Sequence, residues 1–197
     1  MKSLLVLAVC GLAAQAADPY TFTAPEGWRP ERMPFPLGFA KDLEYEGHED
    51  LRFAPGMFKA EAPDYFSYAF VMWIDGAMSF EPASLEKDLL KYYKGLCASV
   101  MKGKKLDVDL SKIKVQVTKL DQKGTLSGEE ADLLHARIDW YDPFVTGKPL
   151  TLHLEIWGRS ADAGKRRCLF ALASPQEKTA PVWETLRKIQ AGFACPK

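Results

Sequence analysis

The stretch 65–75 constrains the fold of this chain more than any other segment, because it is apolar on both of its alternating faces. Phe66 and Phe70 occupy even positions, while Val71 and Trp73 occupy odd positions. Successive side chains of a strand point to opposite faces of the sheet, so a strand of this composition must be covered on both sides. We therefore expect 65–75 to lie centrally in a sheet, with other elements packed above and below it.

Two amphipathic segments can supply that cover. In 83–102, apolar side chains recur at steps of three and four residues, which is the period of a helix with one buried face. Ser84 can cap this helix at its start, and Gly103 can end it. A second helix is predicted after a cap at Thr179, with an apolar face formed by Val182, Trp183, Leu186, Ile189 and Phe193.

The remaining segments predict further strands and one long loop. The segment 25–64 is rich in proline and in large apolar residues, so we expect an ordered loop that wraps the core, with a short strand at 50–53. Consecutive strands with short connections favour an antiparallel sheet. The sequence thus predicts an α+β domain in which a sheet of about six or seven strands lies between two helices. The other strands are expected at 20–24, 113–118, 131–141, 149–158 and 166–174.

The N-terminus has the pattern of an export signal. One lysine precedes an apolar run at 4–14, and small residues stand at the positions where signal peptidase cuts. We predict a signal peptide at 1–16 that is cleaved after Ala16, which leaves one globular domain, 17–197, in the periplasm or outside the cell. The apolar run is too short to span a bilayer, so no transmembrane segment is expected. A lipid anchor on Cys10 is the alternative.

The net charge and the absence of known motifs exclude several classes of function. The chain has 26 Lys and Arg against 26 Asp and Glu, so it has no net charge to attract nucleic acid. It has no phosphate-binding glycine loop, paired-cysteine zinc motif, His-Glu-x-x-His or Gly-x-Ser-x-Gly. We therefore expect no catalytic residue and no cofactor, and we predict a non-enzymatic domain that binds a protein or a small ligand in the cell envelope.

The opening of the predicted mature chain resembles a known fold. Residues 20–28 read Tyr-Thr-Phe-Thr-Ala-Pro-Glu-Gly-Trp, which is similar to the first strand and Pro-x-Gly-Trp turn of many secreted domains of the PsbP and Mog1 type. The order of the later elements also resembles that fold, which the PsbP proteins of the photosystem II lumen share with the Mog1 protein. The resemblance implies an antiparallel sheet between helices, and it transfers no functional residue. The long aromatic segment 25–64 departs from the family pattern.

Three cysteines follow the predicted signal, namely Cys97, Cys168 and Cys195. An oxidising compartment favours one disulfide and leaves one thiol. The strand that starts near Cys168 and the helix that ends near Cys195 have similar lengths and run in opposite directions. The helix should therefore bring Cys195 back close to Cys168. We predict a Cys168–Cys195 disulfide. Cys97 lies on the buried stripe of the first helix and is expected to be a buried apolar side chain rather than a reactive thiol.

The hairpin formed by 131–141 and 149–158 has one polar face. Two registers keep like faces together, and they place either His135 or Arg137 opposite Glu155. One interpretation is a solvent-facing surface held by ion pairs. The alternative is a site for a divalent metal, in a metal-binding protein or a metal-dependent enzyme, because imidazole and carboxylate groups are suitable ligands. Its ligands would be His135, Asp139, His153 and Glu155.

An alternating apolar strip lies inside the proline-rich segment. Phe35, Leu37 and Phe39 occupy every second position of an extended stretch. Packing against the sheet is one interpretation of this pattern. The alternative is an exposed strip that docks a partner protein or a component of the cell envelope. The accessible area of these side chains distinguishes the two.

Overall fold

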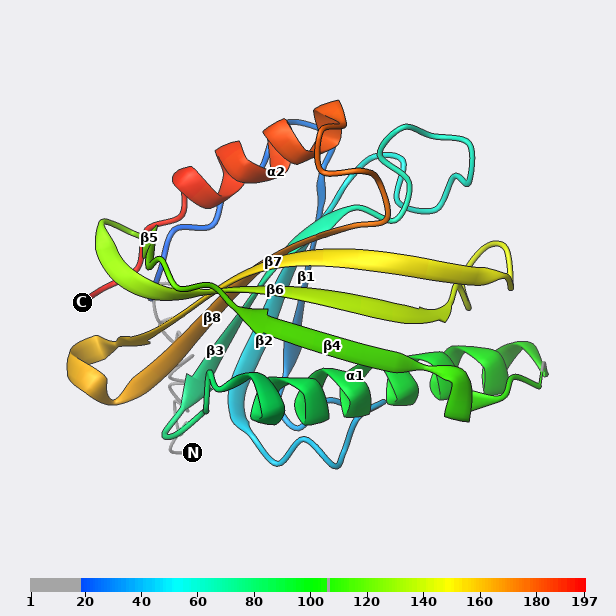
Figure 1. The fold of residues 1–197 in the computed structure, drawn as a ribbon, viewed down its shortest axis with the longest axis horizontal. Helices are drawn as coiled ribbons and strands as arrows, with labels where there is room; N and C mark the ends of the chain where they lie inside the picture. The colour runs from blue at the N-terminus through cyan, green and yellow to red at the C-terminus, as the bar shows by residue number, and fades with distance from the viewer. Residues whose placement is uncertain (1–18, 106) are drawn as a thin grey trace, which may run out of the picture.

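The computed structural model describes residues 19–105 and 107–197, which form an antiparallel sheet with one helix on each face (Figure 1). The predicted signal peptide at 1–16, its cleavage site after Ala16, and Cys10 lie outside these residues. The sheet has the order β1-β2-β3-β8-β7-β6-β4, and the short β5 pairs with β6. The helices are α1 (Pro82–Lys104) and α2 (Pro181–Ala191). The strands are β1 (Arg29–Pro34), β2 (Glu46–Phe53), β3 (Tyr68–Asp75), β4 (Lys114–Lys119), β5 (Gly124–Leu126), β6 (Glu129–Tyr141), β7 (Pro149–Ala161) and β8 (Arg166–Ser174).

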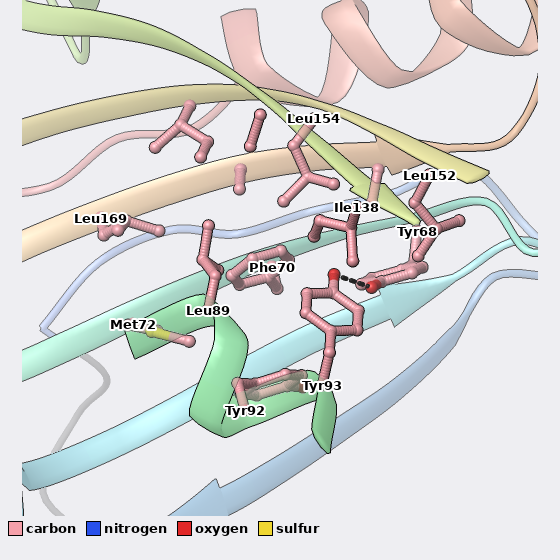
Figure 2. Close-up of a cluster of buried hydrophobic side chains, with 14 of the residues drawn as sticks. Tyr68, Phe70, Met72, Leu89, Tyr92, Tyr93, Ile138, Leu152, Leu154 and Leu169 are labelled. Atoms are coloured by element: carbon pink, nitrogen blue, oxygen red, sulfur yellow. Dashed lines mark hydrogen bonds between the residues drawn. The ribbon is translucent and has the colours of Figure 1, made fainter. Parts of the chain in front are cut away.

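The strand predicted at 65–75 is β3, and it lies between β2 and β8 with both faces covered. Every residue of β3 except Asp75 is buried. Tyr68, Phe70 and Met72 pack in the core beneath α1, where the Tyr68 and Tyr93 hydroxyls are 2.7 Å apart (Figure 2). Burying side chains of this size contributes about 1.5–3 kcal/mol each, so this strand stabilises both layers of the domain.

A second core lies on the opposite face of the sheet, beneath α2. It contains Val71 and Trp73 of β3, together with the five residues predicted for the apolar face of the second helix, all of which are buried. The N-terminal segment crosses this layer through a bridge between Thr21 and Ala194. The strand predicted at 20–24 is therefore wrong, because only this isolated bridge forms there.

The segment 25–64 differs most from its prediction. Instead of one wrapping loop with a short strand at 50–53, it contains all of β1 and a longer β2, Glu46–Phe53. Pro30 and Pro34 lie in β1, which is an edge strand and pairs with β2 alone. Proline is tolerated there because one side of an edge strand makes no ladder hydrogen bonds. The prolines that suggested a loop instead mark the border of the sheet.

Both helices begin differently from the sequence prediction. Ser84 and Thr179 do not cap them, since the N-cap residues are Glu81 and Ala180, and each helix has a proline in its first turn. Proline suits that position because its missing N–H would have no partner inside the helix. At the other end, α1 continues past Gly103 to a left-handed Lys105. No helix in the described part of the chain is long and apolar enough to cross a membrane.

Candidate ligand pocket

A cavity of about 230 Å³ lies between α1, the strands β1, β2 and β3, and three loops. Aromatic and aliphatic side chains provide most of its wall. Small-molecule sites are concave and mostly apolar, with few polar groups, so this cavity is the natural candidate for a ligand site. It is lined by Arg29, Glu31, Met33, Phe39, Leu51, Phe53, Met57, Phe58, Phe66, Tyr68, Tyr92, Leu96 and Phe144.

The sheet contributes one wall because the pleat of three strands aligns their side chains. Arg29 of β1 is paired with Phe53 of β2, and Phe53 is paired with Tyr68 of β3. The Arg29 guanidinium lies 5.1 Å from the ring centre of Phe53 and 5.2 Å from that of Phe58. These cation–π contacts hold an exposed charge beside an apolar cavity.

The loop between β6 and β7 supplies Phe144, and Asp142 fixes its conformation. The Asp142 carboxylate is buried and accepts hydrogen bonds from the backbone N–H groups of Phe144 at 2.9 Å and Val145 at 3.1 Å. Burial alone would raise its pKa, but these bonds and the Tyr65 hydroxyl at 2.5 Å lower it below the usual value. The loop is therefore organised around a buried, ionised carboxylate.

The loop between β2 and β3 supplies Met57, Phe58 and Phe66. The Asp64 carboxylate accepts a hydrogen bond from the Gly56 N–H at 3.0 Å, which closes this loop on itself. Phe66 has a backbone φ of 50°, a left-handed conformation that is rare for aromatic residues. Such strain persists where the surroundings hold it, and it gathers at functional sites. Phe58 is 41% exposed, so the pocket opens to solvent beside it.

A buried acid lies directly behind the lining. Glu49 of β2 is fully buried, pairs with Met33 across the sheet, and accepts a hydrogen bond from the Tyr92 hydroxyl at 3.2 Å. Its other oxygen, Oε1, has no hydrogen-bond partner. Burial raises the pKa of Glu49 to about 8, with a smaller contribution from the negative charge of Glu31. Glu49 therefore carries a proton at neutral pH and adds no negative charge behind the wall of the pocket.

The aromatic strip, for which docking was the alternative interpretation, is largely buried. Phe35 is 8% exposed and Leu37 is fully buried, and both belong to the core beneath α1. Phe39 is half-buried, with its ring centre 5.0 Å from that of Tyr92. Packing against the sheet is the interpretation that these contacts favour. Phe39 also lines the pocket, so one residue of the strip remains part of the candidate site.

The polar hairpin adopts the first of the two predicted registers, with His135 opposite Glu155. Glu155 is nearly buried and is bound by Arg187 at 2.7 Å and Lys178 at 3.3 Å. Asp139 is bound by Arg137 at 2.8 Å. These cations occupy the carboxylates that a metal would need.

The two histidines of the hairpin do not complete a metal site either. Burial lowers the pKa values of His135 and His153, and the nearby cations lower them further. Across residues 19–105 and 107–197, no group of three or more His, Cys, Asp or Glu side chains is arranged to hold a metal ion. The proposed set of His135, Asp139, His153 and Glu155 is thus not gathered into one metal site in the part of the chain described.

All three cysteines of the described chain are free thiols. Cys97 is fully buried, as predicted for a residue on the stripe of α1, and burial raises the pKa of its thiol. Cys168 and Cys195 are not joined in this structure, so their predicted disulfide stays a prediction. Both lie at the second core, beneath the C-terminal end of α2.

Two solved structures are similar to this chain over most of its length. The solution structure of cyanobacterial PsbP (CyanoP) from Synechocystis sp. PCC 6803 has a TM-score of 0.41 and 11% identity, covering 98% of each chain. The crystal structure of LpqN, a protein involved in cell envelope biogenesis of Mycobacterium tuberculosis, has a TM-score of 0.38 and 12% identity. That match covers 91% of this chain and 86% of LpqN.

CyanoP is a PsbP protein, and the PsbP type is also the one that residues 20–28 resemble. No family model and no curated protein sequence matches the chain. At these TM-scores and identities the two structures assign no function to this chain.

Proposed function

We propose that this chain is an exported, non-enzymatic domain of the cell envelope that binds the apolar part of a small ligand in the pocket between α1 and β1–β2. The observation that carries this proposal is an open cavity of about 230 Å³ with an aromatic lining. Exposed Phe58 on its border adds apolar surface that a ligand would remove from water.

The size of the cavity selects the kind of ligand. An engineered apolar cavity of about 150 Å³ binds benzene, whereas drug-sized ligands occupy about 300–1,000 Å³. A cavity between these limits suits a substituted aromatic ring or a short acyl chain rather than a whole cofactor. Arg29 is exposed at the border, so an anionic group on the ligand can remain in solvent beside the guanidinium.

A fluorescent probe of the same chemistry tests the proposal. The probe 1-anilinonaphthalene-8-sulfonate combines aromatic rings with an anionic group, and its emission rises in apolar surroundings. We expect saturable binding with one site per chain and competition by decanoate. The variant Leu96→Trp fills the cavity from α1, because Leu96 lines the pocket and is half-buried. It should weaken probe binding at least tenfold.

The matched control is Val100→Trp on the same helix. Val100 is also half-buried, but it does not line the cavity. This variant should bind the probe as the native chain does, and near-ultraviolet circular dichroism should show that both variants keep their tertiary packing. Absence of saturable binding, or equal binding by Leu96→Trp and the native chain, contradicts the proposal.

A further inference from the structure

The C-terminal residues are held against the sheet by an unusual concentration of polar contacts around Cys195. The Cys195 N–H donates to the Ser127 hydroxyl at 2.7 Å, and that hydroxyl donates to the Cys195 carbonyl at 3.1 Å. Arg159 donates to the Pro196 carbonyl at 2.9 Å. The backbone N–H of Ala163 donates to the Lys197 carbonyl at 2.8 Å. The position of Cys195 is thus fixed, although its side chain remains partly exposed.

Arg159 connects Cys195 with Cys168. Arg159 of β7 and Cys168 of β8 are register partners, so their side chains leave the same face of the sheet. The Nη2 atom of Arg159 lies 2.9 Å from the Cys195 sulfur. Cys168 leaves the sheet beside this guanidinium, and each of the two thiols shifts the pKa of the other. Two cysteines distant in sequence therefore meet one buried cation.

Arg159 is buried without a carboxylate at ion-pair distance in the described residues, although its charge helps to lower the pKa of Glu129. The Arg159 side chain is 7% exposed, and within the described residues it forms no ion pair with Asp or Glu. Its remaining acceptors are neutral carbonyls, and its Nε has no hydrogen-bond partner. Burying a charge is costly unless it is paired, and an anionic sulfur at Cys195 would give this cation a close negative partner.

We propose that Cys195 is the reactive thiol of this protein, activated by Arg159, and that it forms a disulfide with Cys168 by exchange with a small-molecule disulfide. The hydrogen bond from Cys168 and the charge of Arg159 lower the pKa of Cys195 to about 7. By contrast, the hydrogen bond with Cys195 and burial raise the pKa of Cys168. The two thiols therefore have different roles, with Cys195 reacting first.

The reaction proceeds in two exchange steps, with oxidised glutathione as the example of a small-molecule disulfide. The Cys195 thiolate attacks one glutathione sulfur, the glutathione S–S bond breaks, and one glutathione thiolate leaves and takes a proton from water. Cys168 then attacks the Cys195 sulfur, the mixed disulfide breaks, and the departing second glutathione thiolate takes the proton that Cys168 gives up. Two protein thiols are oxidised, and one glutathione disulfide is reduced to two thiols.

The resulting disulfide would fasten the C-terminal residues to β8. It closes the loop that contains the end of β8 and the whole of α2, so it restricts the unfolded chain most where the second core must assemble. We expect the oxidised protein to melt about 5–10 °C above the reduced protein. This role is independent of the ligand pocket, which lies on the other face of the sheet.

The relative reactivity of the three thiols is measured on the reduced full chain by alkylation with iodoacetamide, followed by peptide mass spectrometry. We expect Cys195 to react at least tenfold faster than Cys97 or Cys168 at pH 7. Its rate should follow a titration with a midpoint near pH 7. In Arg159→Gln that midpoint should move upward by one pH unit or more, because the stabilising cation is lost.

Single substitutions separate the two exchange steps. With oxidised glutathione, the native chain should yield a peptide linked through Cys168 and Cys195, and Cys168→Ser should retain glutathione on Cys195. Cys195→Ser should acquire neither, and Cys97→Ala is the matched control that behaves as the native chain. A Cys195 no more reactive than Cys97 overturns the assignment of the reactive thiol. Stable glutathione on Cys195 in the native chain, with no linked peptide, overturns the disulfide.

Discussion

Replacing Glu49 by Gln tests whether a neutral carboxylic acid stands behind the pocket wall. The carboxyl of Glu49 is fully buried, and burial raises its pKa from 4.5 to about 8. In the unfolded chain this group loses its proton as the pH passes 4.5, whereas the folded chain keeps the proton up to about pH 8. Over that interval the unfolded state binds fewer protons than the folded state. The free energy of unfolding must therefore fall as the pH rises.

The magnitude follows from the same two pKa values. At pH 4 the penalty is close to zero, since both states are largely protonated. At pH 7 the folded group is still mostly protonated and the unfolded group is ionised, which costs about 3 kcal/mol. The glutamine of E49Q does not titrate. We therefore expect the unfolding free energy of E49Q, relative to the native chain, to rise by about 3 kcal/mol between pH 4 and pH 7.

Urea unfolding at both pH values measures this difference. Any fixed cost of burying an amide beside Tyr92 is the same at each pH and cancels from the comparison. The control is Glu46→Gln on the same strand, because the Glu46 side chain is exposed. A relative unfolding free energy of E49Q that stays constant from pH 4 to pH 7 would refute the buried neutral acid.

Three further substitutions test the packing around the two cores. Gly95→Ala should lower the unfolding free energy by about 1–3 kcal/mol despite better helix propensity, because a methyl group there meets the Phe39 carbonyl; stabilisation in urea would contradict that contact. Asp142→Asn should cost about 1–3 kcal/mol and weaken probe binding in the pocket, because the 142–148 loop loses its charged acceptor; unchanged melting and probe affinity would count against it. Glu155→Gln should destabilise the protein at pH 7, since the cations that hold Glu155 lower its pKa; this loss should shrink as the pH falls through the carboxylate range, and pH-dependent thermal melts measure it.

The sequence predicts the elements whose periodicity is internal to one segment. The alternation in 65–75 and the helical spacing in 83–102 each require burial on particular faces, and the structure places both accordingly. The edge of the sheet was missed for a physical reason. Proline opposes strand formation only where the sheet needs a backbone N–H at that position. Whether Pro30 and Pro34 are tolerated therefore depends on where β1 lies in the sheet. That position is a property of the whole fold.

The candidate site could not be predicted in the same way. Phe53, Phe66 and Phe144 come from distant segments and carry no shared spacing in the sequence. Each has the composition expected of a core residue, and only the assembled loops show that a cavity remains between them. The Cys168–Cys195 pair was predicted because one strand and one helix bring the chain back over a calculable length, and the disulfide itself stays a prediction. The activation of Cys195 by Arg159 depends on a cross-strand register that the sequence leaves open.

The location of the pocket follows from placing a helix on a wide sheet. A helix is nearly straight, whereas a sheet twists, so a helix that packs closely at one edge must diverge from the other. Here α1 makes its closest backbone approach to β4, which lies beside it in Figure 1, and to β6. The pocket lies over β1 and β2, at the opposite edge of the sheet. Large side chains such as Tyr92 and loop aromatics such as Phe66 reach into that gap without filling it. The proline-bordered edge strand and the cavity are therefore two consequences of one arrangement. A variant that shortened β1 should alter probe binding on the α1 face and leave the thiol chemistry beneath α2 unchanged.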